Sequence, residues 1–221
     1  MQINAKMVNE LRQRTGAGIM DCKRALQETS GDLEKAVTYL REKGMASASK
    51  RAGRVAAEGQ VEAYIHMGGR IGVLVEVNCE TDFVARGEDF KNFCREVAMQ
   101  VAAANPQYLS RDDVPAEVVE AEKQIYRKQA QESGKPEKIW DQIAEGRLKK
   151  FFSEVCLLDQ PYIREQKMTV DKLRQELVAK TGENVVVRRF ARFELGEGIE
   201  KKKSDLAAEV AAQLGQAQAE K

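Results

Sequence analysis

Residues 61–79, VEAYIHMGGRIGVLVEVNC, read as a β-hairpin. Two strand-like runs, at 61–66 and 71–79, flank the glycine-containing segment MGGR, which is typical of antiparallel strands joined by a tight connection. In the second run Glu76 and Asn78 alternate with apolar residues, so one face of that strand is predicted to be buried. The residues of the buried face are Val73, Val75, Val77 and Cys79.

The sequence that follows supplies the rest of a core. A helix is predicted over 88–104, where apolar residues recur at helical spacing and gather into one stripe. The stripe consists of Phe90, Phe93, Cys94, Val97 and Val101. Another helix over 169–180 ends at Gly182, and VVVRRFARF at 185–193 reads as a third strand. We therefore predict a core domain in which helices pack on a three-stranded antiparallel sheet.

Two more helices are predicted between these elements. One follows Pro115 and runs to about 132, where SGKP ends it. The next has a continuous apolar face that belongs to a core or to a partner interface. That face consists of Ile139, Trp140, Ile143, Ala144, Leu148, Phe151, Phe152 and Val155. Beyond Gly196 the chain is rich in Lys, Glu, Ala and Gln, and we expect a mobile tail that includes a short amphipathic helix.

On the N-terminal side, residues 5–43 are predicted to form three short helices, with turns at TGAG (15–18) and SGD (30–32). KGMASASKRAGR, 43–54, has the composition of a polar linker, although its alanines also permit helix. The chain is thus predicted to be an α+β protein. Its parts are a three-helix domain at 1–45, a linker at 46–58, the core domain at 59–196 and a tail at 197–221.

The composition disfavours several classes of function. The 221 residues include 36 Lys and Arg against 35 Asp and Glu, so the chain has no long-range field that would draw it to nucleic acid or to an anionic membrane. Basic clusters at 50–54 and 201–203 have no interleaved aromatic residues, and solvated charge explains them better than RNA binding. No apolar run approaches the roughly 20 residues of a membrane span. We expect a protein with reduced thiols in the cytoplasm; an organellar matrix or stroma also fits.

Residues suited to catalysis are sparse. His66 is the only histidine, so a histidine-assisted nucleophile could be built only around it. The four cysteines lack the paired spacing that zinc sites use, and the glycine clusters lack the Lys-Ser/Thr ending of a phosphate-binding loop. We therefore predict no cofactor and no metal, and a protein that is not an enzyme but acts by contact with a partner.

Met20 is an apolar residue outside these patterns. The stripe that its helix is predicted to turn toward the small core is formed by Ile19, Cys22 and Leu26. Met20 falls outside that stripe, with Arg12 and Lys23 on neighbouring surface. It is either an adaptable contact for a partner or a singly exposed apolar residue of the ordinary kind.

Phe83, in NCETDFVAR at 78–86, is another apolar residue outside the predicted core patterns. Thr81 is predicted to cap a helix whose first turn contains Asp82 and Phe83, where the unpaired amides favour an acid and an aromatic ring has few neighbours. Gly87 interrupts the phase toward the next helix, so Phe83 need not join its stripe. The ring either folds back over the end of the sheet or stays exposed.

Three segments together resemble the translation elongation factor Ts family. They are LRQRTGAGIMDCKRAL at 11–26, NCETDFVAR at 78–86 and KTGENVVVRRFARFELG at 180–196. The resemblance covers about residues 3 to 196. It implies a guanine-nucleotide exchange factor for elongation factor Tu, the GTPase that delivers aminoacyl-tRNA to the ribosome. It also implies that the N-terminal helices are a ubiquitin-associated-like (UBA-like) domain that rests on this GTPase.

The resemblance further implies which residues meet the partner. Those near the contact of the N-terminal domain are Arg12, Ile19, Met20 and Lys23. The family's TDFV segment, whose phenylalanine wedges into the GTPase and disturbs its magnesium site and phosphate-binding loop, corresponds to Thr81, Asp82, Phe83 and Val84. Similar short forms with a single core pair into homodimers, so a two-to-two complex is expected, with an exposed face of the 185–193 strand available for the pairing.

One competing hypothesis is a dimeric adaptor that docks ubiquitin-like or helical partners without any nucleotide exchange. Such an adaptor would have no use for Phe83. A third hypothesis, RNA binding through the basic linker and tail, predicts a strong dependence of affinity on salt, and the near-neutral charge disfavours it.

Overall fold

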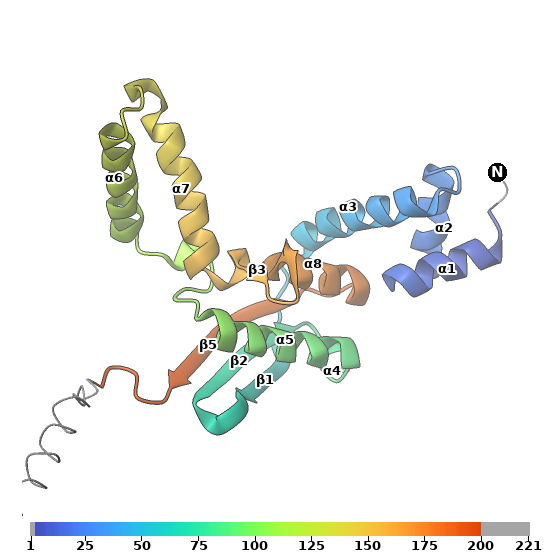
Figure 1. Ribbon diagram of the computed structural model, residues 1–221. Helices are drawn as coiled ribbons and strands as arrows, with labels where there is room; N and C mark the ends of the chain where they lie inside the picture. The colour runs from blue at the N-terminus through green and yellow to red at the C-terminus, as the bar shows by residue number, and fades with distance from the viewer. Residues whose placement is uncertain (1–2, 200–221) are drawn as a thin grey trace, which may run out of the picture.

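The computed structural model describes residues 3–199, with 45–49 as backbone only, and shows the predicted α+β architecture (Figure 1). The helices are α1 Ala5–Thr15, α2 Ile19–Glu28, α3 Leu33–Arg51, α4 Asp82–Ala85, α5 Glu88–Ala104, α6 Ala116–Glu132, α7 Trp140–Val155 and α8 Val170–Thr181. The strands are β1 Glu58–Ile65, β2 Ile71–Cys79, β3 Pro161–Tyr162, β4 Glu165–Thr169 and β5 Val186–Glu194. Among the described residues, no helix combines the length and apolar character of a membrane span. The amphipathic helix predicted in the tail lies outside the described residues.

Helices α1, α2 and α3 form the predicted N-terminal unit. Asn4 caps α1 by accepting a hydrogen bond from the Met7 amide at 3.0 Å, and Gly16 ends this helix in the left-handed conformation. The small core between the three helices is formed by Leu11, Cys22, Ala25, Leu26 and Ala36. Ile19 does not join this core, contrary to the prediction, and is 53% exposed. It is the first residue of α2, a full turn before the buried Cys22.

Helix α3 includes most of the segment 43–54, which was predicted as a polar linker while its alanines left a partly helical form open. Contacts with α8 account for the extension, because tertiary packing stabilises helices more than propensity does. A Cβ on Gly44 would lie only 2.8 Å from the Ala179 Cβ, so the two helices are in close contact. Arg41 and Glu176 add an ion pair at 3.2 Å. The helix therefore extends from the N-terminal unit onto the body, and only residues 52–57 form the loop that leads into β1.

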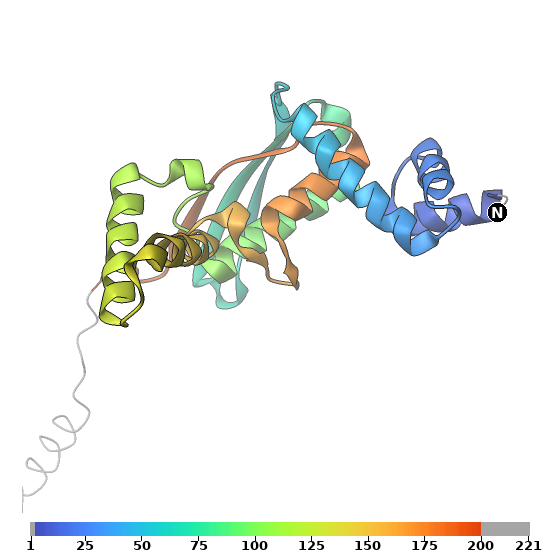
Figure 2. The ribbon, with the colours of Figure 1, turned by 90° about the horizontal axis from the view of Figure 1, so that it is seen from above.

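The central sheet has the strand order β1-β2-β5, and both pairings are antiparallel. Helix α5 lies across β1 and β2, and α8 packs beside α5, so that these helices cover one face of the sheet (Figure 2). The alternation predicted for β2 and the stripe predicted for α5 are both confirmed by burial. The buried residues are Val73, Val75, Val77 and Cys79 from β2, and Phe90, Phe93, Cys94, Val97 and Val101 from α5.

Helices α6 and α7 pair as a hairpin that projects from the body (Figure 1). Ala130 and Ala144 are buried between them, and an ion pair joins Arg127 to Asp141 at 3.2 Å. At the base of the hairpin the aromatic end of α7 packs on a small cluster. That cluster is formed by Val114, Val155 and Cys156, with Tyr108, Val118, Val119, Phe151 and Phe152 around it. Part of the apolar face predicted on α7 therefore serves a core.

The short hairpin of β3 and β4 was not predicted from the sequence. A buried glutamine pair connects it to α5: the Gln100 side-chain amide donates to Gln160 Oε1 at 3.1 Å and to the Pro161 carbonyl at 3.2 Å. Gln100 Oε1 in turn accepts a hydrogen bond from the Ile163 amide at 2.9 Å. Polar side chains therefore help to hold this element in place, together with its buried Tyr162 and Met168.

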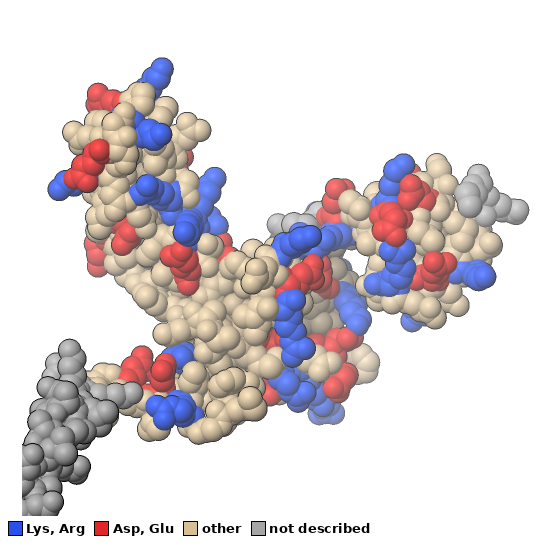
Figure 3. Space-filling view, viewed as in Figure 1, with Lys and Arg blue, Asp and Glu red and all other residues tan. Residues whose placement is uncertain are grey.

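Charges of both signs are interspersed over the face seen in Figure 3, and neither sign gathers into one extended patch there. Charged side chains of the protein also pair with each other. Examples are Arg14 with Glu34 at 2.6 Å and Lys180 with Asp89 at 2.5 Å. The balance of charge in the composition is thus also a local balance on this face.

Two glycines are expected to respond in opposite ways to alanine. Gly59 in β1 has a φ of +145°, and a Cβ there would lie 2.1 Å from the Val77 carbonyl oxygen. Gly59→Ala should therefore lower the free energy of unfolding by about 2 kcal/mol or more. Gly146 lies inside α7, where an added Cβ would meet no neighbouring residue within 4 Å, and Gly146→Ala should raise the same free energy by up to about 1 kcal/mol. Urea titration measures both; equal signs would contradict this account.

Candidate functional site

Helix α4 is a single turn between β2 and α5. Thr81 caps it as predicted, because its Oγ1 accepts a hydrogen bond from the Val84 amide at 3.4 Å. Asp82 lies in the first turn, where a carboxylate is favoured, and forms an ion pair with Arg86 at 2.9 Å. The turn is thus defined at both ends by side-chain contacts.

The side chains of this turn separate into a buried and an exposed side. Val84 and Ala85 are each only 9% exposed and belong to the core cluster of the sheet, whereas Phe83 is 83% exposed. Of the two positions open to the ring, the structure shows the exposed one. Val84 differs from its neighbours in the TDFV segment, because it anchors the turn from inside.

Hydrogen bonds to Glu183, a residue distant in the sequence, hold the start of α4. They were not predicted from the sequence. The Glu183 carboxylate accepts hydrogen bonds from the Glu80 amide at 3.1 Å, the Thr81 amide at 3.0 Å and the Thr81 hydroxyl at 2.6 Å. Glu183 follows Gly182, which ends α8 in the left-handed conformation. The only local signal is a glycine followed by an acid, and that signal does not identify a partner about a hundred residues away.

The residues expected at the N-terminal contact lie on the ends of α1 and α2. All four are exposed, and the two apolar ones, Ile19 and Met20, are 53% and 66% exposed. The four residues are Arg12, Ile19, Met20 and Lys23. Met20 is outside the small core, as predicted, and Ile19 adjoins it on the same surface turn.

A groove of about 690 Å³ lies between the N-terminal unit and α4. Gly16, in the turn from α1 to α2, lines one side, and the other is lined by α4 and by the end of α8 at Lys180. A Cβ on Gly16 would lie 2.9 Å from Lys180 Cε, so the two sides meet closely at that point. Among the described residues, the lining includes Asp82, Phe83 and Val84 but none of the four residues on α1 and α2.

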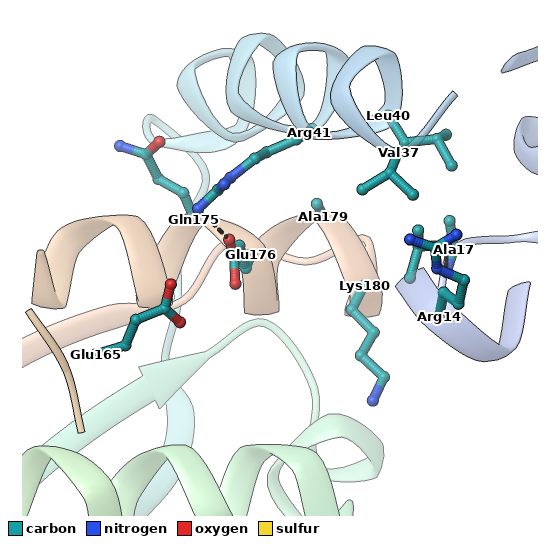
Figure 4. Close-up of a pocket in the computed structure, with 12 residues that line it drawn as sticks. Arg14, Ala17, Val37, Leu40, Arg41, Glu165, Gln175, Glu176, Ala179 and Lys180 are labelled. Carbon is teal, nitrogen blue, oxygen red and sulfur yellow. Dashed lines mark hydrogen bonds and ion pairs between the residues drawn. The ribbon is translucent and has the colours of Figure 1, made fainter. Parts of the chain in front are cut away.

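A second pocket, of about 320 Å³, lies between α1, α3 and α8 (Figure 4). Figure 4 shows the ion pair of Arg41 with Glu176 across it. Two other cations of the lining, Arg14 and Lys180, also have carboxylate partners. We interpret this pocket as the joint between the N-terminal unit and the body, since Arg14, Arg41 and Lys180 in its lining are all paired within the protein.

The titratable groups considered for catalysis are structural. His66 lies at the β1–β2 connection, at the opposite end of β2 from α4, and is exposed, with its ring Nδ1 3.1 Å from the Tyr64 hydroxyl. Burial, together with the nearby Glu183 carboxylate, raises the pKa of the Cys79 thiol to about 11, and its Sγ donates to the Thr81 carbonyl at 3.2 Å. Within residues 3–199, no cluster of three or more His, Cys, Asp or Glu side chains is arranged to hold a metal ion.

Comparison with known proteins agrees with the resemblance. A family model described as elongation factor TS matches residues 5–197. The protein named elongation factor Ts from Heliobacterium modesticaldum is 61% identical over 96% of this chain and 99% of its own. Its namesake from Geobacter sulfurreducens is 60% identical, covering 97% of this chain and all of its own, and that from Caldanaerobacter subterraneus is 65% identical over 90% of this chain.

The chain belongs to the elongation factor Ts family. This membership confirms the resemblance read from the three segments and makes the protein an elongation factor of protein biosynthesis. The match covers the N-terminal unit, the sheet body and the projecting hairpin in one continuous range. For this family member, the contacts that individual residues make with a partner remain predictions.

The thiols of this family member are expected to be unreactive in the folded state. All four cysteines are buried, and burial raises the pKa of Cys94 to about 12 and that of Cys156 to about 11. Because the thiolate is the nucleophile, a disulfide reagent such as DTNB at pH 8 should label none in the native protein and four after denaturation. Met20→Cys, at an exposed position, is the positive control and should add one fast thiol. Rapid native labelling of wild type would contradict the buried placement.

Proposed function

We propose that this protein is the guanine-nucleotide exchange factor of elongation factor Tu and that it releases GDP by contact, making no covalent bond itself. In this proposal the Phe83 ring enters the GTPase beside its switch helix and displaces the magnesium site and the phosphate-binding loop. The N-terminal unit rests on the same GTPase through Arg12, Ile19, Met20 and Lys23. The protein acts in the cytoplasm or in an organellar compartment that has its own translation.

The observation that supports this function best is the exposure of Phe83 on a turn that is otherwise held. A singly exposed apolar side chain is ordinary on a protein surface. Here, however, Val84 and Ala85 are buried on the same turn. Thr81 caps the turn and also donates a hydrogen bond from its hydroxyl to Glu183. Because this turn is already ordered, the ring can enter a partner with little further loss of conformational entropy.

The groove between the N-terminal unit and α4 supports a partner that contacts both. Its two sides are the α1–α2 turn and the TDFV turn. A protein element seated there would touch Phe83 while the neighbouring surface of α1 and α2 reached another part of the same partner. We therefore assign binding energy to the N-terminal unit and the disturbance of the nucleotide site to α4.

The size of the effect available from Phe83 follows from its burial. Full burial of a phenylalanine contributes about 1.5–3 kcal/mol, and a tenfold change in affinity takes about 1.4 kcal/mol. The ring alone therefore accounts for roughly ten- to hundredfold weakening of GDP, and any larger effect requires the wider interface. By linkage, GDP must weaken the binding of this protein by the same factor.

Phe83→Ala tests the proposed role. It should slow the release of a fluorescent GDP analogue from elongation factor Tu about ten- to hundredfold at equal concentrations, since it removes the inserted ring. Ile125→Ala on α6, another exposed apolar position, is the matched control and should leave the rate unchanged. Release at the wild-type rate with Phe83→Ala would rule out the wedge.

The adaptor hypothesis is separated by the effect of nucleotide on binding. An exchange factor is displaced from its GTPase by excess GDP because of the reciprocal coupling. An adaptor would bind its partners equally well with and without GDP. Capture of elongation factor Tu on the immobilised protein, with and without GDP, distinguishes these two outcomes.

We also propose that two copies pair through the uncovered face of the sheet. Exposed apolar residues of three strands meet on it, and the register aligns Ala63, Leu74 and Ala191 across the strands. The large exposed members are Val61 at 62%, Ile65 at 67%, Leu74 at 47% and Phe193 at 68%. A contiguous apolar patch of this kind marks an interaction surface.

Beside this apolar face, hydrogen bonds from Arg188 and Arg189 lower the pKa of Glu76. The Glu76 carboxylate therefore stays charged at the rim of the face.

Leu74→Glu, at the centre of this face, should convert the dimer to a monomer. The introduced carboxylates would be buried against each other in a dimer but stay hydrated in a monomer. Sedimentation should give twice the mass of one chain for wild type and the mass of one chain for the variant. Ile125→Glu on the projecting hairpin is the control and should remain dimeric. A monomeric wild type would refute the pairing.

A further inference from the structure

A polar node at residues 183–184 joins three segments that are far apart in the sequence. Glu183 accepts three hydrogen bonds from residues 80 and 81, at the entry to α4. The neighbouring Asn184 amide donates to Glu80 Oε1 at 2.6 Å, so each segment bonds the other in return. The loop between α8 and β5 and the turn before α4 are therefore connected by four hydrogen bonds.

Asn184 extends the node to the end of α3. Its side-chain amide donates to the Arg54 carbonyl at 2.8 Å and to the Ala52 carbonyl at 3.4 Å, and it is only 1% exposed. Arg54 also approaches Glu80 Oε1 at 3.5 Å. The same loop thus contacts the chain that leaves the N-terminal unit and the chain that enters the TDFV turn.

The Thr81 hydroxyl has two bonds whose directions depend on each other. It donates its proton to Glu183 Oε1 at 2.6 Å and accepts the Val84 amide at 3.4 Å. A hydroxyl has one proton, so donation to Glu183 leaves its lone pairs available for the amide of the turn. The carboxylate of Glu183 therefore orients the cap as well as bonding the backbone before it.

We propose that Glu183 is a positioning residue for Phe83: through Thr81 and Glu80 it sets the direction in which α4 presents the ring, and Asn184 ties that direction to the N-terminal unit. This inference rests on the proposed exchange function. A helix of one turn has almost no stability of its own, so contacts outside it decide its conformation. Val84 and Ala85 fix its depth in the core, and Glu183 fixes its start.

Removal of Glu183 should loosen the turn without unfolding the body. In Glu183→Ala the Glu80 and Thr81 amides and the Thr81 hydroxyl lose their common acceptor. Thr81 is exposed, so water can replace these bonds, but water does not hold one geometry. Misplacement of a contacting group by about 1 Å can reduce a rate by up to about a hundredfold. We expect the exchange rate to fall about tenfold, with the binding of the N-terminal unit retained.

A double-mutant cycle with Phe83→Ala is the first test, measured as release of a fluorescent GDP analogue. Glu183→Ala should slow release about tenfold in the wild-type background and less than twofold when Phe83 is already alanine, because it acts through that ring. Glu183→Gln keeps one oxygen for the two amides and should give an intermediate rate. Asp159→Ala, which removes another carboxylate with two bonds from an arginine, is the control and should match wild type.

Amide hydrogen exchange on the free protein is the second test and does not depend on the GTPase. Glu183→Ala should speed exchange in residues 80–85 at least tenfold and leave the interior of α5 unchanged. Unchanged protection of 80–85, or a loss of exchange activity that is equal with and without Phe83, would overturn the positioning role. If Phe83→Ala itself has no effect on GDP release, the proposed wedge role of Phe83 fails, while the hydrogen-exchange result still decides whether Glu183 holds the turn.

Discussion

A phenylalanine ring kept in water on a fixed turn is the constraint on which the rest of this structure depends. Contact with any apolar surface within reach lowers the free energy of an exposed ring, so on a flexible segment the ring would fold back onto the sheet. Helix α4 prevents this because Val84 and Ala85 are already buried on its inner side. The turn cannot rotate to bury Phe83 without exposing them. The valine-rich face of β2 and the stripe of α5 form the rigid support beneath.

The same requirement explains why the N-terminal unit is joined by a helix. If one partner contacts both the α1–α2 surface and Phe83, the distance between these sites has to be set before binding, or the partner must supply the ordering energy. The close approach of Gly44 to Ala179 and the ion pair of Arg41 with Glu176 fix α3 on α8. Gly16, in the α1–α2 turn, lies close to the Lys180 side chain on α8 and adds a second contact between the two parts. The groove beside α4 is thus a property of the fold and needs no partner to form it.

Apolar periodicity predicted most of the fold because the sheet and its helices each bury one face. Where periodicity was absent, prediction failed for identifiable reasons. The extension of α3 depends on a contact with α8 that only the tertiary structure reveals, and β3 and β4 depend on Gln100 and Gln160, whose polar side chains resemble surface residues in the sequence. Ile19 matched the spacing of the core stripe but lies beyond the end of that core. For Phe83, physical reasoning left two positions open, and Glu183 could not be connected to Thr81 by any local pattern.

An exchange factor must also let its partner go, and this limits how much surface it can use. The coupling is reciprocal, so the same free energy that weakens GDP is lost again when a nucleotide returns and displaces the factor. A large apolar interface at α4 would hold the GTPase against that return. In the proposed mechanism, the four-residue turn with its one exposed ring would supply a small, directed contribution at the nucleotide, while the N-terminal unit would stay engaged with a surface that the nucleotide does not touch. The division between a small contact that disturbs and a separate contact that binds therefore follows from linkage, and it requires the fixed geometry that α3, α8 and the loop at Glu183 provide.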